Sequence, residues 1–334
     1  MNSKDRILAG FRNSKSEEVG VWFMRQAGRF LPDYRKLRGK YSFEEMCKDP
    51  ELIREVTLLP LRYMDVDALI IFSDILTPLW GCGIDLKFVE GGGPLVGEVD
   101  SYVEALKRYD FNKNKFLFDG IKLVKNEVKD DKFLLGFSAA PFTFLAYLLE
   151  GGHSRNFLKI RSMIYERSDY LEDLFEITSE MIILYLEKQF EAGVDGAQIF
   201  DSWIGYMGRE RFIWYKKFLK KIFKKFEGKN LIYFPLNSVH IMKEMVDLSV
   251  KVISVDWRCD ISYPVEIGFK GGIQGNLDPA VFFLDEAVVF REVEKILMEK
   301  DKLNGFIFNT GHGLHPETPY NIVKKVVDFI HQWR

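Results

Sequence analysis

Eight short apolar segments recur along the chain, and most are separated by segments with a helical pattern of apolar residues. Continuous apolar runs of this kind are typical of parallel strands, because helices bury such strands on both faces. The segments that we expect to form strands are 20–24, 68–72, 133–137, 196–200, 231–234, 252–255, 271–273 and 305–308. Alternating strands and helices produce a parallel sheet, and eight such units predict a (β/α)8 TIM-type barrel.

Nothing in the composition of the 334 residues marks a boundary between two domains. We therefore expect residues 1–334 to form a single barrel domain, in which about the first 19 residues are an N-terminal extension with a short helix near 5–11. A chain of this length is also compatible with an open, doubly wound sheet, which is the alternative architecture.

The net charge of −2 argues against a general nucleic-acid-binding protein, which would carry a basic excess. Cys47, Cys82 and Cys259 are far apart and form no CxxC pair, so we expect no disulfide framework and a reducing compartment. The first residues lack the apolar core of a signal peptide, and the longest uncharged run, 133–149, is shorter than the roughly 20 residues of a membrane helix. We expect a cytoplasmic protein that does not enter the membrane.

A basic segment follows the first expected strand without any transition. Six basic residues and one acidic residue lie between Arg25 and Lys40, and Arg25 and Arg29 are bracketed by apolar residues. Arginine pairs bidentately with carboxylate or phosphate, and Gly28 allows the backbone to come close to a ligand. We interpret this segment as an anion-binding floor for a small molecule with several negative groups; a solvated basic loop is the alternative.

Polar residues that end other strands are further candidates, because barrel enzymes place their active sites at the C-terminal ends of the strands. Asp74 follows a buried run, where a carboxylate is costly unless it is paired. It could stabilise a cation or accept N–H groups of a ligand, or it could cap a helix or pair with a structural arginine. His312 lies between two glycines that leave its imidazole accessible, although a structural histidine would fit there equally well.

The other candidate residues and motifs indicate which kinds of site the chain can form. Tyr147 lies in an apolar helical segment, so its hydroxyl needs a partner, which can be a ligand or the backbone. Ser202 has no GxSxG context, and we interpret it as a hydrogen-bond donor. No HExxH or Cys/His set accompanies His312 and His315, so no metal site is expected. The glycine-rich segment 81–97 has no nucleotide motif and is expected to be a surface loop or small hairpin.

Several longer motifs occur in a fixed order along the chain. They are FMRQAGRFLPDYR at 23–35, IIFSDIL at 70–76, GFSAAPFTFLAY at 136–147, QIFDSW at 198–203, GNLDP at 275–279 and FNTGHG at 308–313. With these motifs the chain resembles the uroporphyrinogen decarboxylase family over essentially its full length. The resemblance implies a barrel that is commonly a homodimer and uses no cofactor or metal. It also implies four successive decarboxylations that convert the acetate side chains of uroporphyrinogen III to methyl groups, giving coproporphyrinogen III.

The resemblance also assigns roles to individual residues. Contact with the substrate carboxylates falls to three arginines, Arg25, Arg29 and Arg38. Contact with the pyrrole N–H groups falls to Asp74, further polar contacts fall to Tyr147, Ser202 and His312, and the backbone of Gln26 and Ala27 is expected to face the cleft. The residues expected to take part in catalysis are Arg25, Arg29, Asp74, Tyr147 and His312.

The expected chemistry needs no cofactor, because a pyrrole ring protonated at carbon accepts the electrons released as CO2 leaves. The proton donor stays open between Arg25 or Arg29 as a relay, His312 and water. The alternative function is a zinc-dependent corrinoid methyltransferase of the same superfamily, which needs His and Cys ligands at close spacing. His240 has no cysteine two residues further on, which disfavours that alternative. A non-enzymatic porphyrin binder is the third option.

Overall fold

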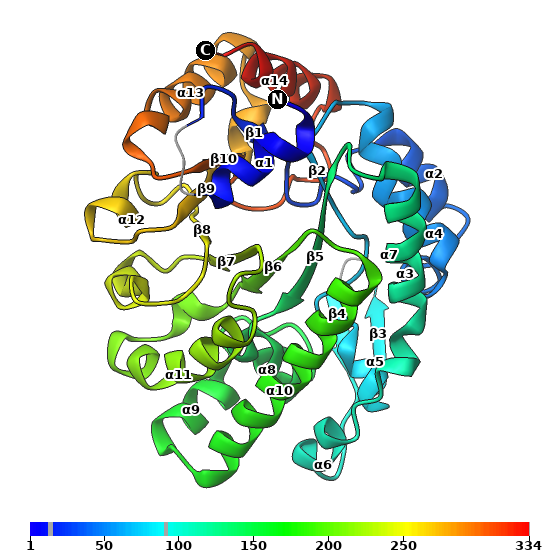
Figure 1. Cartoon of the computed structure of the whole chain (residues 1–334). Coiled ribbons are helices and arrows are strands. Elements are labelled where there is room, and N and C mark those ends of the chain that lie inside the picture. Colours follow the sequence, from blue (N-terminus) through cyan, green and yellow to red (C-terminus); the bar gives the residue numbers. More distant parts are fainter. Residues whose placement is uncertain (13–15, 90–92, 334) are drawn as a thin grey trace.

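The computed structural model describes residues 1–12, 16–89 and 93–333, and eight parallel strands form its centre (Figure 1). The strands pair in the order β1-β10-β9-β8-β7-β6-β5-β2. Their bounds are β1 (Gly20–Val21), β2 (Ala68–Ile70), β5 (Phe133–Ala139), β6 (Gly196–Asp201), β7 (Leu231–Pro235), β8 (Val252–Ser254), β9 (Gly272–Leu277) and β10 (Phe306–Thr310). The predicted barrel is thus confirmed, and the doubly wound alternative is wrong.

Helices surround the strands, as Figure 1 shows. They are α1 (Ser3–Phe11), α2 (Pro32–Arg38), α3 (Phe43–Lys48), α4 (Pro50–Leu58), α5 (Pro78–Cys82), α6 (Tyr102–Lys107), α7 (Lys115–Val128), α8 (Pro141–Glu150), α9 (Leu158–Glu166), α10 (Asp169–Ala192), α11 (Arg209–Lys225), α12 (Tyr263–Glu266), α13 (Glu286–Met298) and α14 (Tyr320–Gln332). Short 3-10 helices cover Leu59–Arg62, Phe111–Asn114, Ile204–Tyr206, Val239–Met245, Pro279–Phe283 and Lys300–Lys302.

The glycine-rich segment contains a small hairpin, as expected. Its strands, β3 (Leu86–Val89) and β4 (Gly93–Val96), pair antiparallel outside the barrel, and residues 90–92 between them lie outside the described residues.

The first strand is shorter than the sequence indicates. Its ladder with β10 ends soon after Val21, because Met24 N–H donates to the Asn309 side chain at 3.1 Å and Arg25 adopts a left-handed backbone conformation with φ of 64°. The other edge of β1 faces the start of β2, where Asp67 N–H donates to the Val21 carbonyl at 2.8 Å. This backbone hydrogen bond brings the two edge strands of the sheet together, so that the barrel is nearly closed.

Polar side chains cross the middle of the barrel. Trp22 Nε1 donates to Gln274 Oε1 at 2.9 Å, and Gln274 Nε2 donates to Gln198 Oε1 at 2.8 Å and to Ser254 Oγ at 3.0 Å. These residues come from β6, β8, β9 and the segment after β1, so the network spans strands that are not neighbours. All four side chains are fully buried and hydrogen-bonded, which is how buried polar groups are tolerated.

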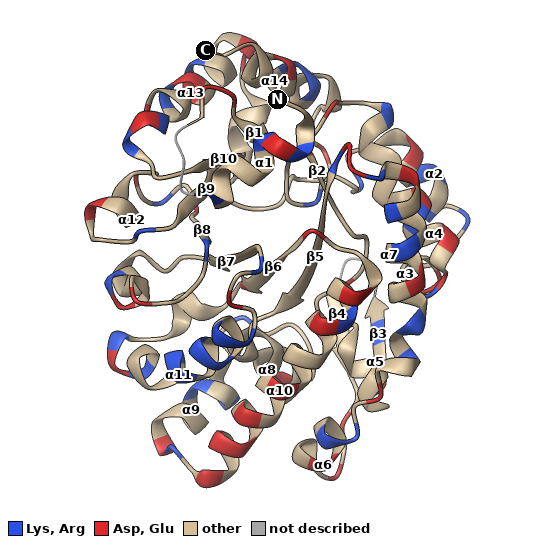
Figure 2. Ribbon diagram, viewed as in Figure 1, with Lys and Arg blue, Asp and Glu red and all other residues tan. Residues whose placement is uncertain are grey.

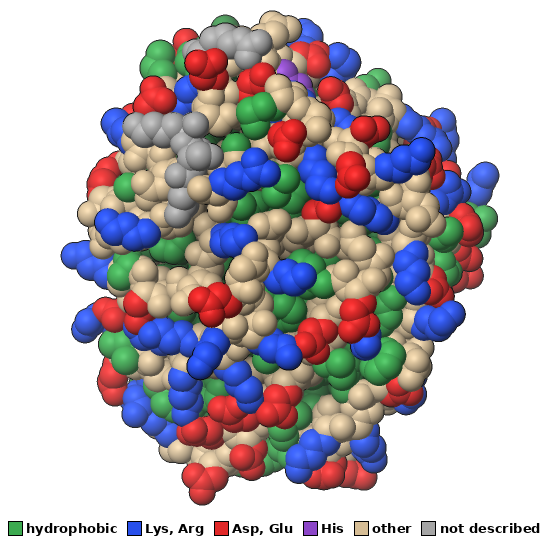
Figure 3. Space-filling model, viewed as in Figure 1, with side chains coloured by type: hydrophobic (Ala, Val, Ile, Leu, Met, Phe, Trp, Pro, Cys, Tyr) green, Lys and Arg blue, Asp and Glu red, His purple; other side chains and the backbone are tan. Residues whose placement is uncertain are grey.

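On the outside, charged residues of opposite sign face each other between neighbouring helices. Figure 2 shows acidic residues along α10 and basic residues along α11. Lys221 pairs with Glu176 at 2.6 Å and with Glu180 at 2.9 Å, and Lys217 pairs with Glu172. Basic residues (Lys and Arg) and acidic residues are also mixed over the face seen in Figure 3. No helix in the described part of the chain is long and apolar enough to cross a membrane.

Helix α1 packs beneath the strands, with Ile7 and Phe11 buried in one cluster with Trp22 and Phe133. Arg6 of this helix donates twice to Asp67 Oδ1, at 2.9 and 2.7 Å. The Asp67 side chain is completely buried, and its other oxygen accepts Val21 N–H at 2.8 Å and lies 2.9 Å from His331 Nε2. This carboxylate therefore joins α1, β1 and α14 at the base of the barrel.

Replacing Asp67 should destabilise the fold strongly. Asp67→Ala leaves the Arg6 guanidinium without its buried partner, which typically costs about 3–5 kcal/mol. We expect urea unfolding to show a loss of that size in the free energy of unfolding. Asp130→Ala is the control. The Asp130 side chain pairs with Lys4 but is 85% exposed, so the Tm of this variant should not differ measurably from that of the wild type. Equal melting of the two variants would contradict the assignment.

Candidate active site

A cavity of about 650 Å³ opens at the C-terminal ends of the barrel strands. Seven of the nine residues that sequence reasoning singled out line it, namely Arg25, Ala27, Arg29, Asp74, Tyr147, Ser202 and His312. They come from segments that follow β1, β2, β6 and β10 and from helix α8, and parallel strands bring these segments to one rim.

Arg25 and Arg29 place two guanidinium groups on this cavity, and both side chains are exposed to it. The pKa of Arg25 is below its ordinary value, because surrounding protein disfavours the charged form and Arg29 adds like charge. Asp74 and Tyr147 act in the opposite direction. Both arginines thus lie where the anion-binding interpretation requires them. The Arg35 guanidinium instead donates to the Arg29 carbonyl at 2.8 Å and holds the loop from outside.

Asp74 is half-buried on the wall of the same cavity. Its Oδ1 accepts Leu76 N–H at 2.8 Å, which fixes the turn before α5. Within the described residues its Oδ2 has no hydrogen bond, and no ion pair within 4.0 Å forms to a structural arginine. Burial raises the pKa of Asp74 to about 6, while the Leu76 N–H and the Arg25 charge lower it. At neutral pH the carboxylate is thus mostly ionised, with one oxygen available to a ligand.

Tyr147 lies on the turn of α8 that faces the cavity, half-buried beside Trp203, with ring centroids 5.8 Å apart. Burial and the Asp74 charge raise the pKa of Tyr147 to about 12, and the nearby Trp203 indole acts in the opposite direction. The tyrosine hydroxyl therefore stays protonated at neutral pH and can donate a hydrogen bond into the cavity.

His312 is half-buried at the β10 side of the cavity. Burial and the neighbouring Arg25 charge lower the pKa of His312 to about 4. Its imidazole is therefore neutral at physiological pH and can donate or accept a hydrogen bond, but it carries no charge.

An apolar wall that sequence reasoning missed completes the cavity. Phe137, Phe200 and Phe234 follow one another on β5, β6 and β7, with ring centroids 5.9 and 6.0 Å apart and edge-to-face geometry. His153 and Tyr34 also line the cavity and were not singled out. The signal available for the three phenylalanines was their place near the ends of apolar strands, but continuous apolar runs do not reveal which side chains point inward.

Two expected residues lie outside the cavity wall. The Gln26 side chain is buried and joins the segment after β1 to β2, since its Oε1 accepts Phe23 N–H at 3.0 Å and its Nε2 donates to the Ala68 carbonyl at 2.9 Å. Arg38 ends α2 and donates to the Tyr41 carbonyl at 2.7 Å. Both side chains bind backbone groups of the barrel or the basic segment, and neither residue is among those that line the cavity.

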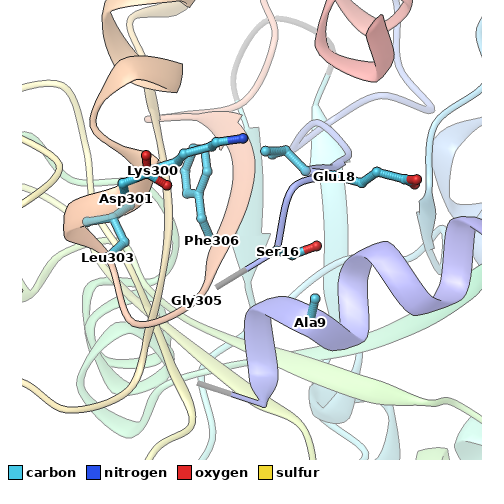
Figure 4. Close-up of a pocket in the computed structure, with 9 residues that line it drawn as sticks. Ala9, Ser16, Glu18, Lys300, Asp301, Leu303, Gly305 and Phe306 are labelled. Carbon is cyan, nitrogen blue, oxygen red and sulfur yellow. The ribbon is translucent and has the colours of Figure 1, made fainter. Parts of the chain in front are cut away.

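Another, much smaller pocket lies between α1 and the segment before β10 (Figure 4). Its volume of about 20 Å³ has room for little more than one water molecule.

In the described ranges, no three His, Cys, Asp or Glu side chains lie close enough to hold a metal ion.

Known proteins resemble this chain along nearly its whole length. The family model of uroporphyrinogen decarboxylase (URO-D) matches residues 2–333. Uroporphyrinogen decarboxylase of Aquifex aeolicus is 38% identical over 335 residues, covering 99% of this chain and 98% of the relative. That of Bacillus subtilis is 36% identical over 336 residues, covering 98% and 95%.

Among solved structures, a methyltransferase from Methanosarcina mazei superposes with a TM-score of 0.79, covering 99% of this chain and 98% of that one. Its sequence identity of 18% shows a shared fold alone. The family model and the curated relatives, in contrast, match by sequence over the segments that build the cavity. The chain belongs to the uroporphyrinogen decarboxylase family.

Proposed function

We propose that this protein decarboxylates uroporphyrinogen III, converting its four acetate side chains to methyl groups to give coproporphyrinogen III. The observation that carries the proposal is a single cavity that combines Arg25, Arg29 and an available Asp74 carboxylate oxygen with an aromatic wall. A tetrapyrrole with several carboxylates needs this combination, because its rings are apolar and its periphery is anionic. Membership of the family supports the same reaction.

In the proposed reaction, a proton first adds to the ring carbon next to the one that bears the acetate side chain, and the pyrrole becomes a cation. The bond between the acetate methylene and its carboxylate then breaks, CO2 leaves, and the electron pair neutralises the ring. A second proton completes the methyl group, and the first proton leaves the ring carbon, which restores the pyrrole. Asp74 stabilises the cationic ring and accepts its N–H, and a negative group placed in advance where positive charge develops lowers the barrier.

The arginines hold the carboxylates that do not react at that moment. Each guanidinium can form two parallel hydrogen bonds with a carboxylate, which fixes orientation as well as affinity. Tyr147 and Ser202 donate further hydrogen bonds, and His312 contributes a neutral imidazole. Because the pKa of His312 is lowered to about 4, it is not an imidazolium acid at neutral pH. We therefore assign proton delivery to water held beside Arg25.

The proposal also includes the oligomeric state and the cellular location of the protein. The family resemblance supports a homodimer, and the free thiols of Cys47, Cys82 and Cys259 support a reducing compartment such as the cytoplasm. The methyltransferase alternative is supported only by a shared barrel fold at 18% identity.

Asp74→Asn tests the proposed role of the charge. The amide keeps the shape of the side chain but removes the negative charge, so kcat should fall by about 10²–10³-fold with chemically reduced uroporphyrin as substrate. Chromatography of the oxidised products counts the remaining carboxylates, and wild-type protein should yield mainly the tetracarboxylate. Near-wild-type product formation by the variant would refute the role of Asp74, and an inactive wild type would refute the function.

The pH profile should report the ionisation of Asp74. Its pKa is raised to about 6, so the carboxylate gains a proton and loses its charge as pH falls through that value. We expect kcat/KM to decrease below pH 6, with a slope of about tenfold per pH unit. This decrease at acidic pH should be absent from the residual activity of Asp74→Asn. A wild-type limb centred near pH 4 would point to His312 instead.

Arg29→Ala should weaken substrate binding. Loss of a charge-assisted pair costs at least about 1.5 kcal/mol, so KM should rise by about tenfold or more. Lys40→Ala is the matched control, since Lys40 lies in the same basic segment but does not line the cavity. Steady-state kinetics decide the matter: equal KM values for Arg29→Ala and Lys40→Ala would remove Arg29 from the binding site.

A further inference from the structure

Arg25 has a backbone conformation that arginine rarely adopts. Its φ of 64° lies in the left-handed region, where a non-glycine residue is strained and persists only when its surroundings enforce it. Arg25 also contributes a guanidinium to the cavity, so its conformation decides where that charge lies. The residues that enforce this conformation therefore decide where the Arg25 charge lies in the cavity, whose wall some of them also form.

Strand β10 and the loop after it hold the residue before Arg25 on both sides. Asn309 Oδ1 accepts Met24 N–H at 3.1 Å, and Leu314 N–H donates to the Met24 carbonyl at 2.9 Å. Asn309 is completely buried, and the same Oδ1 accepts Thr310 N–H at 2.8 Å. The backbone just before Arg25 is therefore anchored to residues near the C-terminal end of the sequence.

Gly313 of the same loop lies directly against the Arg25 side chain. A Cβ placed on Gly313 would be 2.3 Å from Arg25 Cδ, 2.6 Å from Cγ and 2.8 Å from Nε. The backbone of Gly313 is not in the left-handed region, so an alanine could adopt its conformation. Glycine is needed at this position for space alone, and the side chain that occupies the space is Arg25.

We propose that Gly313 is a positioning residue for Arg25. Its missing side chain lets the aliphatic part of Arg25 lie flat on the β10 loop, which directs the guanidinium into the cavity that also contains Asp74. This inference rests on the proposed decarboxylase function for its consequence in catalysis, but the geometry of Arg25 can be tested separately.

Gly313→Ala should displace Arg25 and leave the fold intact. A guanidinium moved by about 1 Å costs on the order of 100-fold in activity, so kcat/KM should fall by about that factor. Gly208→Ala is the matched control, because a Cβ at Gly208 would meet nothing within 4 Å and its backbone is not left-handed either. The two variants should melt within a few degrees of each other.

A double-mutant cycle separates positioning from general damage. Arg25→Ala removes Cγ, Cδ and Nε, the atoms that a Cβ at Gly313 would meet. Adding Gly313→Ala to Arg25→Ala should then reduce kcat/KM no further, because two residues that act through one interaction are not additive. Equal fold-losses in the wild-type and Arg25→Ala backgrounds would overturn the inference, as would an unchanged kcat/KM in the single variant.

A crystal structure of Gly313→Ala gives a result that does not depend on the activity. A displaced Arg25 guanidinium supports the inference, and an unmoved one overturns it, whereas absence of turnover by the wild type refutes only the proposed function. Should Gly313→Ala fail to fold, recovery of folding in the double variant supports the contact with Arg25, and equal failure of both overturns it.

Discussion

The architecture depends on how the shortest strand closes the barrel. β1 has only two residues, yet it must join β10 on one side and reach β2 on the other. The buried Asp67 makes this possible, because it binds Val21 N–H, Arg6 and His331 while its own N–H donates to the Val21 carbonyl. With β1 held in place, Arg25 emerges beside the β10 loop and opposite the strands that carry the phenylalanine wall. Closure at the base of the barrel therefore places the charges at its mouth.

The site itself keeps opposite charges near each other without pairing them. Arg25 and Asp74 influence each other's pKa, but within the described residues neither has an ion pair within 4.0 Å. A salt bridge between them would occupy both groups. Leaving them apart in a partly dehydrated cavity costs stability and keeps each available to a ligand, a balance expected of binding sites that are formed in advance. The separated charges of Arg25 and Asp74 are thus both available to the proposed reaction.

Much of this could be read from sequence, and the limits have physical causes. The eight strands were recognisable because buried parallel strands are uniformly apolar, and Arg25 and Asp74 stood out because charges follow such runs directly. The same uniform apolarity concealed the wall of Phe137, Phe200 and Phe234, since alternation was missing as a guide to direction. Gln26 and Arg38 were expected at the cleft by resemblance. The left-handed turn at Arg25 sends Gln26 back between β1 and β2, and the Tyr41 carbonyl holds Arg38 at the end of α2.

The most direct test of the central claim is a crystal structure with coproporphyrinogen III bound. The account predicts that the macrocycle lies in the cavity at the C-terminal ends of the strands, against the phenylalanine wall. The Asp74 carboxylate should accept pyrrole N–H groups at ordinary hydrogen-bond distances of about 2.7–3.2 Å, with propionate carboxylates on Arg25 and Arg29. A macrocycle bound on another face, or one held with its rings turned away from Asp74, would contradict it.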